Sequence, residues 1–369
     1  MLSNLSRHWM RYQESLFDDF EEACGLMTDR HKEIILALDV IGLDNFLFDG
    51  PSYSVGRPRR SRLAIGRAFV AKAALNLSTT KGMIERLKVD SMLRRICGFD
   101  SVREIPAEST FSDAFSEFAR TDLMSKIHES MIKISFKDVL IGHISRDATE
   151  IHAREKIANP GKKTLRKKKI PTGYKRGRPR KDEVRDVKPK NNIQIQMTQK
   201  LPQILNGLPK RFNCGSKKGS RGHLSQWFGY KLHLDVCDDG IPISCILTSA
   251  SVNDNQCSVP LELMTNSRVQ SLYTLGDKGY DSADLRTHVA SFGKIPLFQP
   301  RNYESLNKIE FDPAMSERFK RRTSVERAFS RCKDSFGCRN VRVKGHAKVL
   351  AHVMTGILML CAMRILETT

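Results

Sequence analysis

The order of strand-like and helix-like segments between residues 136 and 336 constrains the fold of this chain most strongly. Two runs of alternating apolar residues flank the tetrapeptide CDDG within residues 227–251, which predicts a β-hairpin. The expected segments in chain order are a strand at 136–153, this hairpin, a helix at 253–265, a strand at 271–277, a helix at 282–292, a strand at 294–300 and a helix at 313–336. This order predicts an α/β fold with a mixed sheet, in which strands joined through helices pair in parallel.

Residues 1–130 have helical patterns and predict an all-α region ahead of the sheet. Apolar residues recur at helical spacing in 61–77, and the STT segment at 78–80 can cap the following helix. Residues 105–120 repeat the pattern, with Ser109 as the expected cap. Three phenylalanines share one face of this second helix, which is typical of core packing: Phe111, Phe115 and Phe118.

The most apolar part of the chain is residues 349–366. This segment contains His352 and Arg364, and it predicts a buried C-terminal helix, with a membrane span as the alternative. The first 20 residues lack the apolar stretch of a signal peptide. We therefore expect a soluble, cytoplasmic protein without a membrane partner.

The balance of charges indicates a polyanionic partner. The chain has 62 Lys and Arg residues against 41 Asp and Glu residues, a formal net charge of +21, which favours nucleic acid over the alternative of a merely basic soluble protein. Its nine cysteines form no C-x-x-C pair. This pattern favours reduced thiols in the cytosol over disulfides or a zinc site.

A long polar segment at about 154–222 separates the first expected strand from the hairpin. Within residues 161–190 there are 14 Lys and Arg residues and 3 Asp and Glu residues, together with Pro and Gly. A composition of this kind cannot bury a core, so the segment predicts a flexible basic insertion.

Two of the expected strands end in an isolated acidic residue, Asp147 and Asp277. Strand ends of an open α/β sheet meet at a crevice where ligands bind. Glu326, on the helix at 313–336, can reach the same crevice. Three converging carboxylates without basic partners would repel one another, so this set predicts a Mg²⁺ site, with two ions acting on a phosphodiester. The alternative is that these acids are turn, cap or solvated helix residues.

The helix around Glu326 combines this acid with bases on one face. At about 100° per residue, Arg322, Glu326 and Lys333 lie within about 40° of one another. Apolar residues lie beside this face and are expected to pack on the sheet: Val325, Phe329 and Phe336. We expect Glu326 to face the metal ions, while Arg322 and Lys333 bind phosphates of the DNA strand.

The spacing Phe319-(2)-Arg322-(3)-Glu326-(6)-Lys333 resembles the Y-(2)-R-(3)-E-(6)-K signature of bacterial insertion-sequence DDE transposases. Phe319 replaces the tyrosine of that signature and has no hydroxyl group. The segments RDATEIHA and GDKGYDS resemble the surroundings of the first and second catalytic Asp of this family, and GYKLHLDVCDDGIPISCILTSASVNDNQ resembles the two strands between them. Residues 56–120 resemble the helical N-terminal domain of these enzymes.

The resemblance implies an RNase H-like catalytic domain at 136–369, interrupted at about 154–222, and a helical DNA-binding domain at 1–130. It also implies a catalytic and metal-binding set of Asp147, Asp277 and Glu326 with two Mg²⁺ ions, for which Mn²⁺ can substitute. The partners would be double-stranded DNA, as the terminal inverted repeats and the target, and a second copy of the chain bound with it. Such a protein would work at the bacterial nucleoid.

Several basic residues are expected to contact DNA. Residues 177–180, GRPR, match the core of an AT-hook that lies in a narrow minor groove, with non-specific phosphate contact as the alternative. The similar GRPRRSR at 56–62 precedes a helix and predicts contacts to the DNA backbone. The expected DNA-binding residues are Arg57, Arg59, Arg178, Arg180, Lys278, Tyr280, Arg322 and Lys333.

Alternatives remain for function and for single residues. A nuclease without strand transfer and a catalytically silent DNA-binding repressor both fit the same motifs. Glu150 is a second candidate for the first metal ligand, Asp281 is expected to cap a helix, and Trp227 is expected in the core. The 48 residues between Asp277 and Glu326 leave no space for an inserted β-domain, so the sequence does not indicate a DNA hairpin pathway.

Overall fold

The computed structural model describes residues 25–47, 59–156, 191–218, 222–300 and 311–368. Within these ranges, six helices of four residues or more precede the first strand: α2 (Asp29–Ile41), α3 (Arg62–Ala74), α4 (Thr80–Val89), α5 (Ser91–Ile96), α6 (Glu108–Arg120) and α7 (Leu123–Ser135). Thr79 caps α4 by accepting from the amide of Gly82, as the sequence predicts. The three phenylalanines of α6 are buried around Phe69 of α3. The cap of α6 is Ala107 rather than Ser109, because the helix already begins at Glu108.

The rest of the described chain forms a six-stranded mixed sheet and its covering helices, which confirms the predicted α/β class. The strands are β1 (Leu140–His152), β2 (Asn213–Lys218), β3 (Leu224–Cys237), β4 (Pro242–Ser249), β5 (Gln270–Gly276) and β6 (Ile295–Phe298). Their order is β2-β3-β1-β5-β6, and β4 also pairs with β3. β3 pairs antiparallel with β1, β2 and β4, whereas β1–β5 and β5–β6 are parallel.

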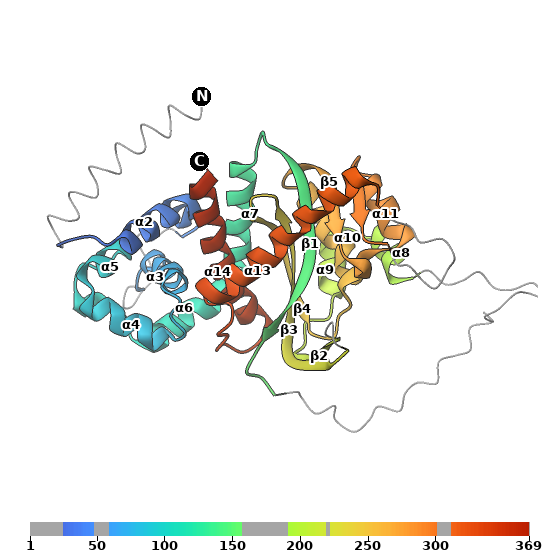
Figure 1. Cartoon of the computed structure of the whole chain (residues 1–369). Helices are drawn as coiled ribbons and strands as arrows, with labels where there is room; N and C mark the ends of the chain where they lie inside the picture. The colour runs from blue at the N-terminus through green and yellow to red at the C-terminus, as the bar shows by residue number, and fades with distance from the viewer. Residues whose placement is uncertain (1–24, 48–58, 157–190, 219–221, 301–310, 369) are drawn as a thin grey trace, which may run out of the picture.

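Helices cover both faces of this sheet (Figure 1). One face packs against α13 (Thr323–Ser335) and α14 (His346–Thr368), and the other against α10 (Ser258–Asn266) and α11 (Ala283–Ala290). Two short helices pack on this second pair: α8 (Asn192–Met197) on both of them and α9 (Leu201–Gly207) on α10. α12 (Pro313–Phe319) and the short 3-10 helix η5 (Lys320–Arg322) lead into α13. All eight residues of β4 are buried, as expected for a strand that is covered on both sides.

The C-terminal helix α14 connects the two parts of the molecule. It packs against α2, α3, α6 and α7 on one side and against α13 and β4 on the other (Figure 1). One continuous apolar core consequently runs from α2 through α14 to the sheet. α14 is long and apolar enough to span a membrane, but 67% of its most apolar window is buried inside the protein. The prediction of a buried C-terminal helix is therefore confirmed.

The polar segment is shorter than the sequence predicts. Residues 191–218, within the expected insertion at 154–222, form α8, α9 and β2. Ile193, Ile204 and Leu208 are the buried anchors that attach this part to the body of the protein. The prediction of a flexible insertion was wrong for 191–218, because a few well-spaced apolar side chains suffice to dock short helices on an existing core. Residues 157–190 lie outside the described residues.

Candidate active site

Asp147 lies within β1, and Asp277 lies beside it, directly after the end of β5. The prediction that both strands end in the acid was wrong for Asp147, because β1 continues to His152 in antiparallel pairing with β3. Arg146 of β1 pairs in register with Gly276 of β5, so the next residue on each strand is one of the two acids. Asp277 accepts a hydrogen bond from the amide of Gly279 at 2.8 Å and thereby caps the 3-10 helix η4 (Lys278–Tyr280). A Cβ atom at position 276 would meet the rings of Phe298 and Tyr280 at 3.0 Å. Glycine at this position therefore allows η4 to fold closely over the end of β5.

Glu326 approaches Asp147 from the facing helix. The register pairs Asp147 with Leu234 of β3, whose side chain belongs to the core beneath α13 and α14. Val325 and Phe329 are buried and hold α13 on the sheet, while Glu326 is exposed with 54% of its side-chain surface. A hydrogen bond also connects β1 to the residues that precede α13: the hydroxyl of Ser145 donates to the carbonyl of Arg321 at 3.2 Å. η5 and the start of α13 are thus fixed above the middle of β1.

Arg322 bridges two of the three carboxylates. Its Nη1 donates to Asp147 Oδ2 at 3.2 Å, and its Nη2 donates to Glu326 Oε1 at 2.8 Å. The one-turn spacing of Arg322 and Glu326 was predicted from the helix, but the contact with Asp147 was not. The expectation that the three acids converge without a basic partner was therefore wrong: the guanidinium lies between Asp147 and Glu326 in this conformation.

The surroundings of Asp147 disfavour its charge. Burial raises its pKa above the ordinary value, and the nearby carboxylate of Asp277 raises it further. The amide of Ala148, which donates to Oδ1 at 2.8 Å, and the Arg322 guanidinium act in the opposite direction. A carboxyl group in this position is stabilised in its charged form by any additional cation that binds beside it.

Lys333 lies about two turns of α13 beyond Glu326 and contacts protein groups. Its Nζ donates to Thr149 Oγ1 at 2.7 Å and to Glu150 Oε1 at 2.8 Å. Burial opposes ionisation of Glu150, but the contact with Lys333 outweighs it, so the pKa of Glu150 is lowered. Glu150, the second candidate for a metal ligand, is thus paired with Lys333 rather than directed at Asp277.

The remaining predicted DNA-contact residues lie in different places. Lys278 is exposed beside Asp277, and Arg59 donates to Glu117 on α6 at 2.5 Å. Tyr280 is fully buried against Phe298, so the prediction that it contacts DNA does not agree with this conformation, since its ring fills the core below η4. Arg57, Arg178 and Arg180 lie outside the described residues. Asp281 pairs with Arg286 at 2.8 Å, and Ser282 caps α11 in its place.

The carboxylates supply the oxygen ligands that Mg²⁺ prefers, but they are not yet gathered around a common point. In the part of the chain that the structure describes, no three His, Cys, Asp or Glu side chains are close enough together to hold a metal ion. Arg322 already places a positive charge between Asp147 and Glu326, so this position accommodates a cation. The residues fit Mg²⁺ on the condition that Arg322 turns away and the exposed Glu326 side chain turns inward.

Sequence reasoning missed the residue that directly precedes Asp147. Arg146 is fully buried and pairs with Asp235 and Glu262, two acids that lie within apolar runs of the sequence. A charged residue in the middle of a buried strand was the available signal, because such a residue needs a buried partner of opposite charge.

Two protein families match separate parts of the chain. Residues 207–362 match the family described as transposase DDE domain, a range that runs from α9 into α14 and contains Asp277 and Glu326. Residues 42–117 match the family described as transposase domain (DUF772), a range that covers α3 to α5 and most of α6. No curated protein and no solved structure matches the chain. Two transposase families thus match separate parts of the chain in the order expected from its sequence, and the chain belongs to the insertion-sequence DDE transposases.

Proposed function

We propose that this transposase binds the terminal inverted repeats of its element as double-stranded DNA, cleaves at the element's ends and joins the freed 3′-OH to target DNA. The observation that carries the proposal is the position of Asp147 within β1 beside Asp277 at the end of β5, with Glu326 on α13 linked to Asp147 through Arg322. Water would attack the phosphorus, the bond to the 3′ oxygen would break, and the new 3′-OH would then displace a 3′ oxygen of the target strand. Each step exchanges one P–O bond for another.

The sheet topology supports an RNase H-like catalytic domain. Taken from β4 through β3, β1 and β5 to β6, the strands comprise three antiparallel neighbours followed by two that run parallel to β1. The parallel pairing of β1 with β5 and of β5 with β6 places Asp147 of β1 beside Asp277 at the end of β5. This arrangement is the one that the family resemblance implies for a carboxylate site of this kind.

The donor set supports divalent metal ions as cofactors, in the form of two Mg²⁺ ions. When bound, two such ions activate the attacking oxygen and stabilise the leaving oxygen of a phosphodiester. Asp147, Asp277 and Glu326 would hold them. Arg322 would turn from the carboxylates to a phosphate of the DNA, where its planar guanidinium can donate two parallel hydrogen bonds. In the same step the carboxylates would lose the cation that compensates them now.

Exposed cations around the candidate active site support DNA binding there. Arg321 and Arg327 are exposed on either side of the Arg322–Glu326 pair, and Arg318 stacks on the Tyr273 ring at 4.8 Å from its centroid. With a formal net charge of +21, the protein attracts a polyanion at long range. We propose that α2–α7 form the part that recognises the inverted repeats. Two protomers would then bring the two ends together at the bacterial nucleoid.

One observation favours a second candidate function. Arg322 pairs with both Asp147 and Glu326 in this conformation, and a protein in which this bridge persists would bind DNA without cutting it. Such a protein would act as a transposition repressor. A nuclease that cuts without joining is the other alternative, and it differs from the transposase only in strand transfer.

The test is cleavage and joining of a labelled duplex that carries the element's own end, in Mg²⁺ or in EDTA, with a supercoiled plasmid as target. The proposal predicts Mg²⁺-dependent nicking at the element boundary, followed by covalent linkage of the label to the plasmid. Nicking without linkage would indicate the nuclease. Binding without nicking in Mg²⁺ or in Mn²⁺ would indicate the repressor.

A further inference from the structure

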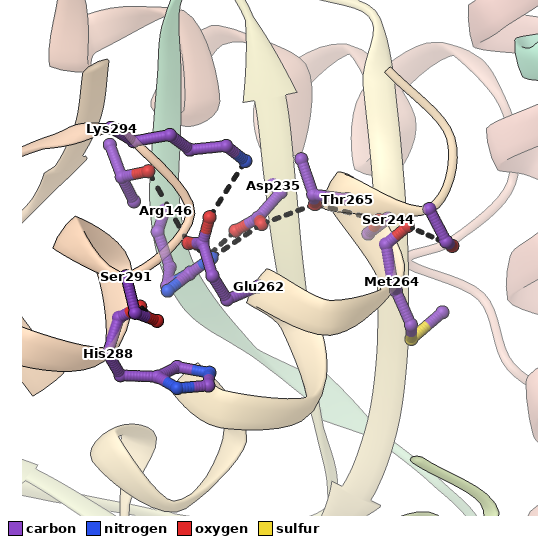
Figure 2. Close-up of polar contacts among 11 residues, drawn as sticks. Arg146, Asp235, Ser244, Glu262, Met264, Thr265, His288, Ser291 and Lys294 are labelled. Carbon is purple, nitrogen blue, oxygen red and sulfur yellow. Dashed lines mark hydrogen bonds and ion pairs between the residues drawn. The ribbon is translucent and has the colours of Figure 1, made fainter. Parts of the chain in front are cut away.

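Four buried charged side chains form a chain of three ion pairs, in the order Asp235, Arg146, Glu262 and Lys294 (Figure 2). Arg146 of β1 donates twice to Asp235 of β3, from Nε to Oδ1 and from Nη2 to Oδ2, both at 2.7 Å. Its Nη2 also donates to Glu262 Oε2 on α10 at 2.9 Å. The other carboxylate oxygen of Glu262 accepts from Lys294 Nζ, just before β6, at 2.8 Å. None of the four residues is more than 4% exposed.

The charges of this network balance within the core. Burial opposes the charge of Arg146, but Asp235 and Glu262 outweigh it and raise the pKa of the guanidinium. Burial likewise opposes ionisation of Glu262, and the neighbouring Arg146 and Lys294 lower its pKa. Buried ion pairs of this kind often contribute little to stability compared with apolar residues of the same volume. Stability alone is therefore a weak explanation for four buried charges on one face of the sheet.

The network lies directly beneath the two candidate catalytic aspartates. Arg146 precedes Asp147, and it pairs in register with Gly276, which precedes Asp277. The network joins β1 to β3 through Asp235 and to β6 through Lys294, and Thr274 of β5 donates to Glu262 Oε2 at 3.4 Å. The network thus links β1, β3, β5 and β6 on this face of the sheet, and its Arg146 lies level with Gly276, which precedes Asp277.

The alternation of side chains along β1 couples the network to the active site. Arg146 lies on the α10 face and Asp147 on the α13 face, because successive residues of a strand point to opposite sides. A shift of β1 by one residue would bring Asp147 under α10 and expose Arg146 beneath α13. Asp235 accepts two hydrogen bonds of Arg146 in one geometry and so specifies the register of β1 against β3. Glu262 contacts both Arg146 and Thr274 of β5 and so links this register to the strand that Asp277 follows.

We propose that Arg146 is a positioning residue of this transposase: through Asp235, Glu262 and Lys294 it fixes the register of β1 and so the separation of the Asp147 and Asp277 carboxylates. This inference rests on the proposed metal-dependent cleavage. In this inference, the buried network holds the two metal ligands within the narrow range of positions that metal binding needs. Small misplacements of ligands or reacting groups cost large factors in rate.

The test uses the full-length protein with Arg146→Met and Asp235→Asn combined. The pair of substitutions removes one charge of each sign, so the remaining Glu262–Lys294 pair stays balanced and the core keeps its volume. Mn²⁺ affinity is measured by electron paramagnetic resonance, cleavage of the labelled end duplex by gel assay, and folding by circular dichroism during urea unfolding. We expect Mn²⁺ affinity to fall by about 10-fold or more and cleavage by about 100-fold, with DNA affinity unchanged.

The matched control removes another ion pair of β3, in Lys231→Met combined with Asp254→Asn, whose charged atoms are 2.9 Å apart. This control is expected to retain wild-type Mn²⁺ affinity and cleavage. Arg146→Lys keeps the charge but cannot donate two parallel hydrogen bonds to Asp235. We expect the cleavage rate of this variant to fall by about 10-fold. If the double variant does not fold, this single variant tests the positioning role of Arg146.

Wild-type Mn²⁺ affinity and cleavage in a folded Arg146 variant would overturn the positioning role while leaving the proposed function intact. Equal losses of Mn²⁺ affinity and cleavage in the variant and in the Lys231–Asp254 control would also overturn it. Removing any ion pair of the sheet would then have the same effect on the active site. If the wild-type protein neither binds Mn²⁺ nor cleaves, the proposed function fails and the positioning role with it.

Discussion

Replacing Glu326 by Gln is expected to lower the rate of DNA-end cleavage by about 10³-fold or more, with DNA affinity retained. The substitution preserves the shape of the side chain and its hydrogen bond to Arg322, but it removes a negative charge that the metal ions need. Glu326 is exposed and contributes nothing to the core, so the fold should not change. The measurement is single-turnover cleavage of the labelled end duplex in Mg²⁺, together with DNA binding in a mobility-shift assay.

Glu317→Gln is the matched control for this experiment. Glu317 is an exposed acid on α12 that pairs with Lys320 at 2.5 Å. It has the same charge as Glu326 and a similar ion pair, but its partner is Lys320 rather than the Arg322 that contacts Asp147. Cleavage by this control should stay within about twofold of the wild type. If both variants, or neither, lost activity, Glu326 would have no special role in catalysis.

Replacing Arg322 by Gln should produce opposite changes in metal binding and in cleavage. Loss of the guanidinium leaves Asp147 and Glu326 without their present cation, so Mn²⁺ should bind several-fold more tightly. At the same time one phosphate contact is lost, which should weaken DNA binding and lower the rate of cleavage by about 100-fold. The slope of the logarithm of DNA affinity against the logarithm of salt concentration should fall by about one. Mn²⁺ titration and salt-dependent DNA binding measure the two effects separately.

Arg331→Gln is the control for Arg322. Arg331 lies on the same helix and pairs with Glu367 at 2.8 Å, but its partner is on α14 rather than at the strand ends. We expect no change in Mn²⁺ affinity for this variant. Unchanged Mn²⁺ affinity in Arg322→Gln as well would show that the guanidinium does not compete with metal ions for the carboxylates.

Much of the fold could be predicted from the sequence because the local patterns are strong. The hairpin of β3 and β4, the parallel strands β5 and β6 and the buried helix α14 follow from alternation, turn residues and apolar length. The order within residues 191–218 could not be predicted, because the docking of α8 and α9 depends on a core assembled from distant segments. Composition describes the average of a segment, whereas a few anchoring residues decide whether it packs.

The candidate site was predictable in part for the same reason. The one-turn spacing of Arg322 and Glu326 is a local property of a helix, and it predicts their contact. The ion pair between Arg322 and Asp147 joins residues 175 positions apart, and the pair of Arg146 with Asp235 joins residues 89 positions apart. Both depend on which strand lies beneath which helix and in which register. Helical periodicity contains no information about either.

Anomalous scattering of Mn²⁺, in crystals of this protein bound to a duplex with the element's end, would locate the metal ions relative to the three carboxylates. We predict Mn²⁺ in contact with the carboxylate oxygens of both Asp147 and Asp277, with Glu326 turned toward the metal and Arg322 moved onto a DNA phosphate. Mn²⁺ absent from this position, with Arg322 still bridging Asp147 and Glu326 in the DNA complex, would contradict the assignment of these three carboxylates as the catalytic site.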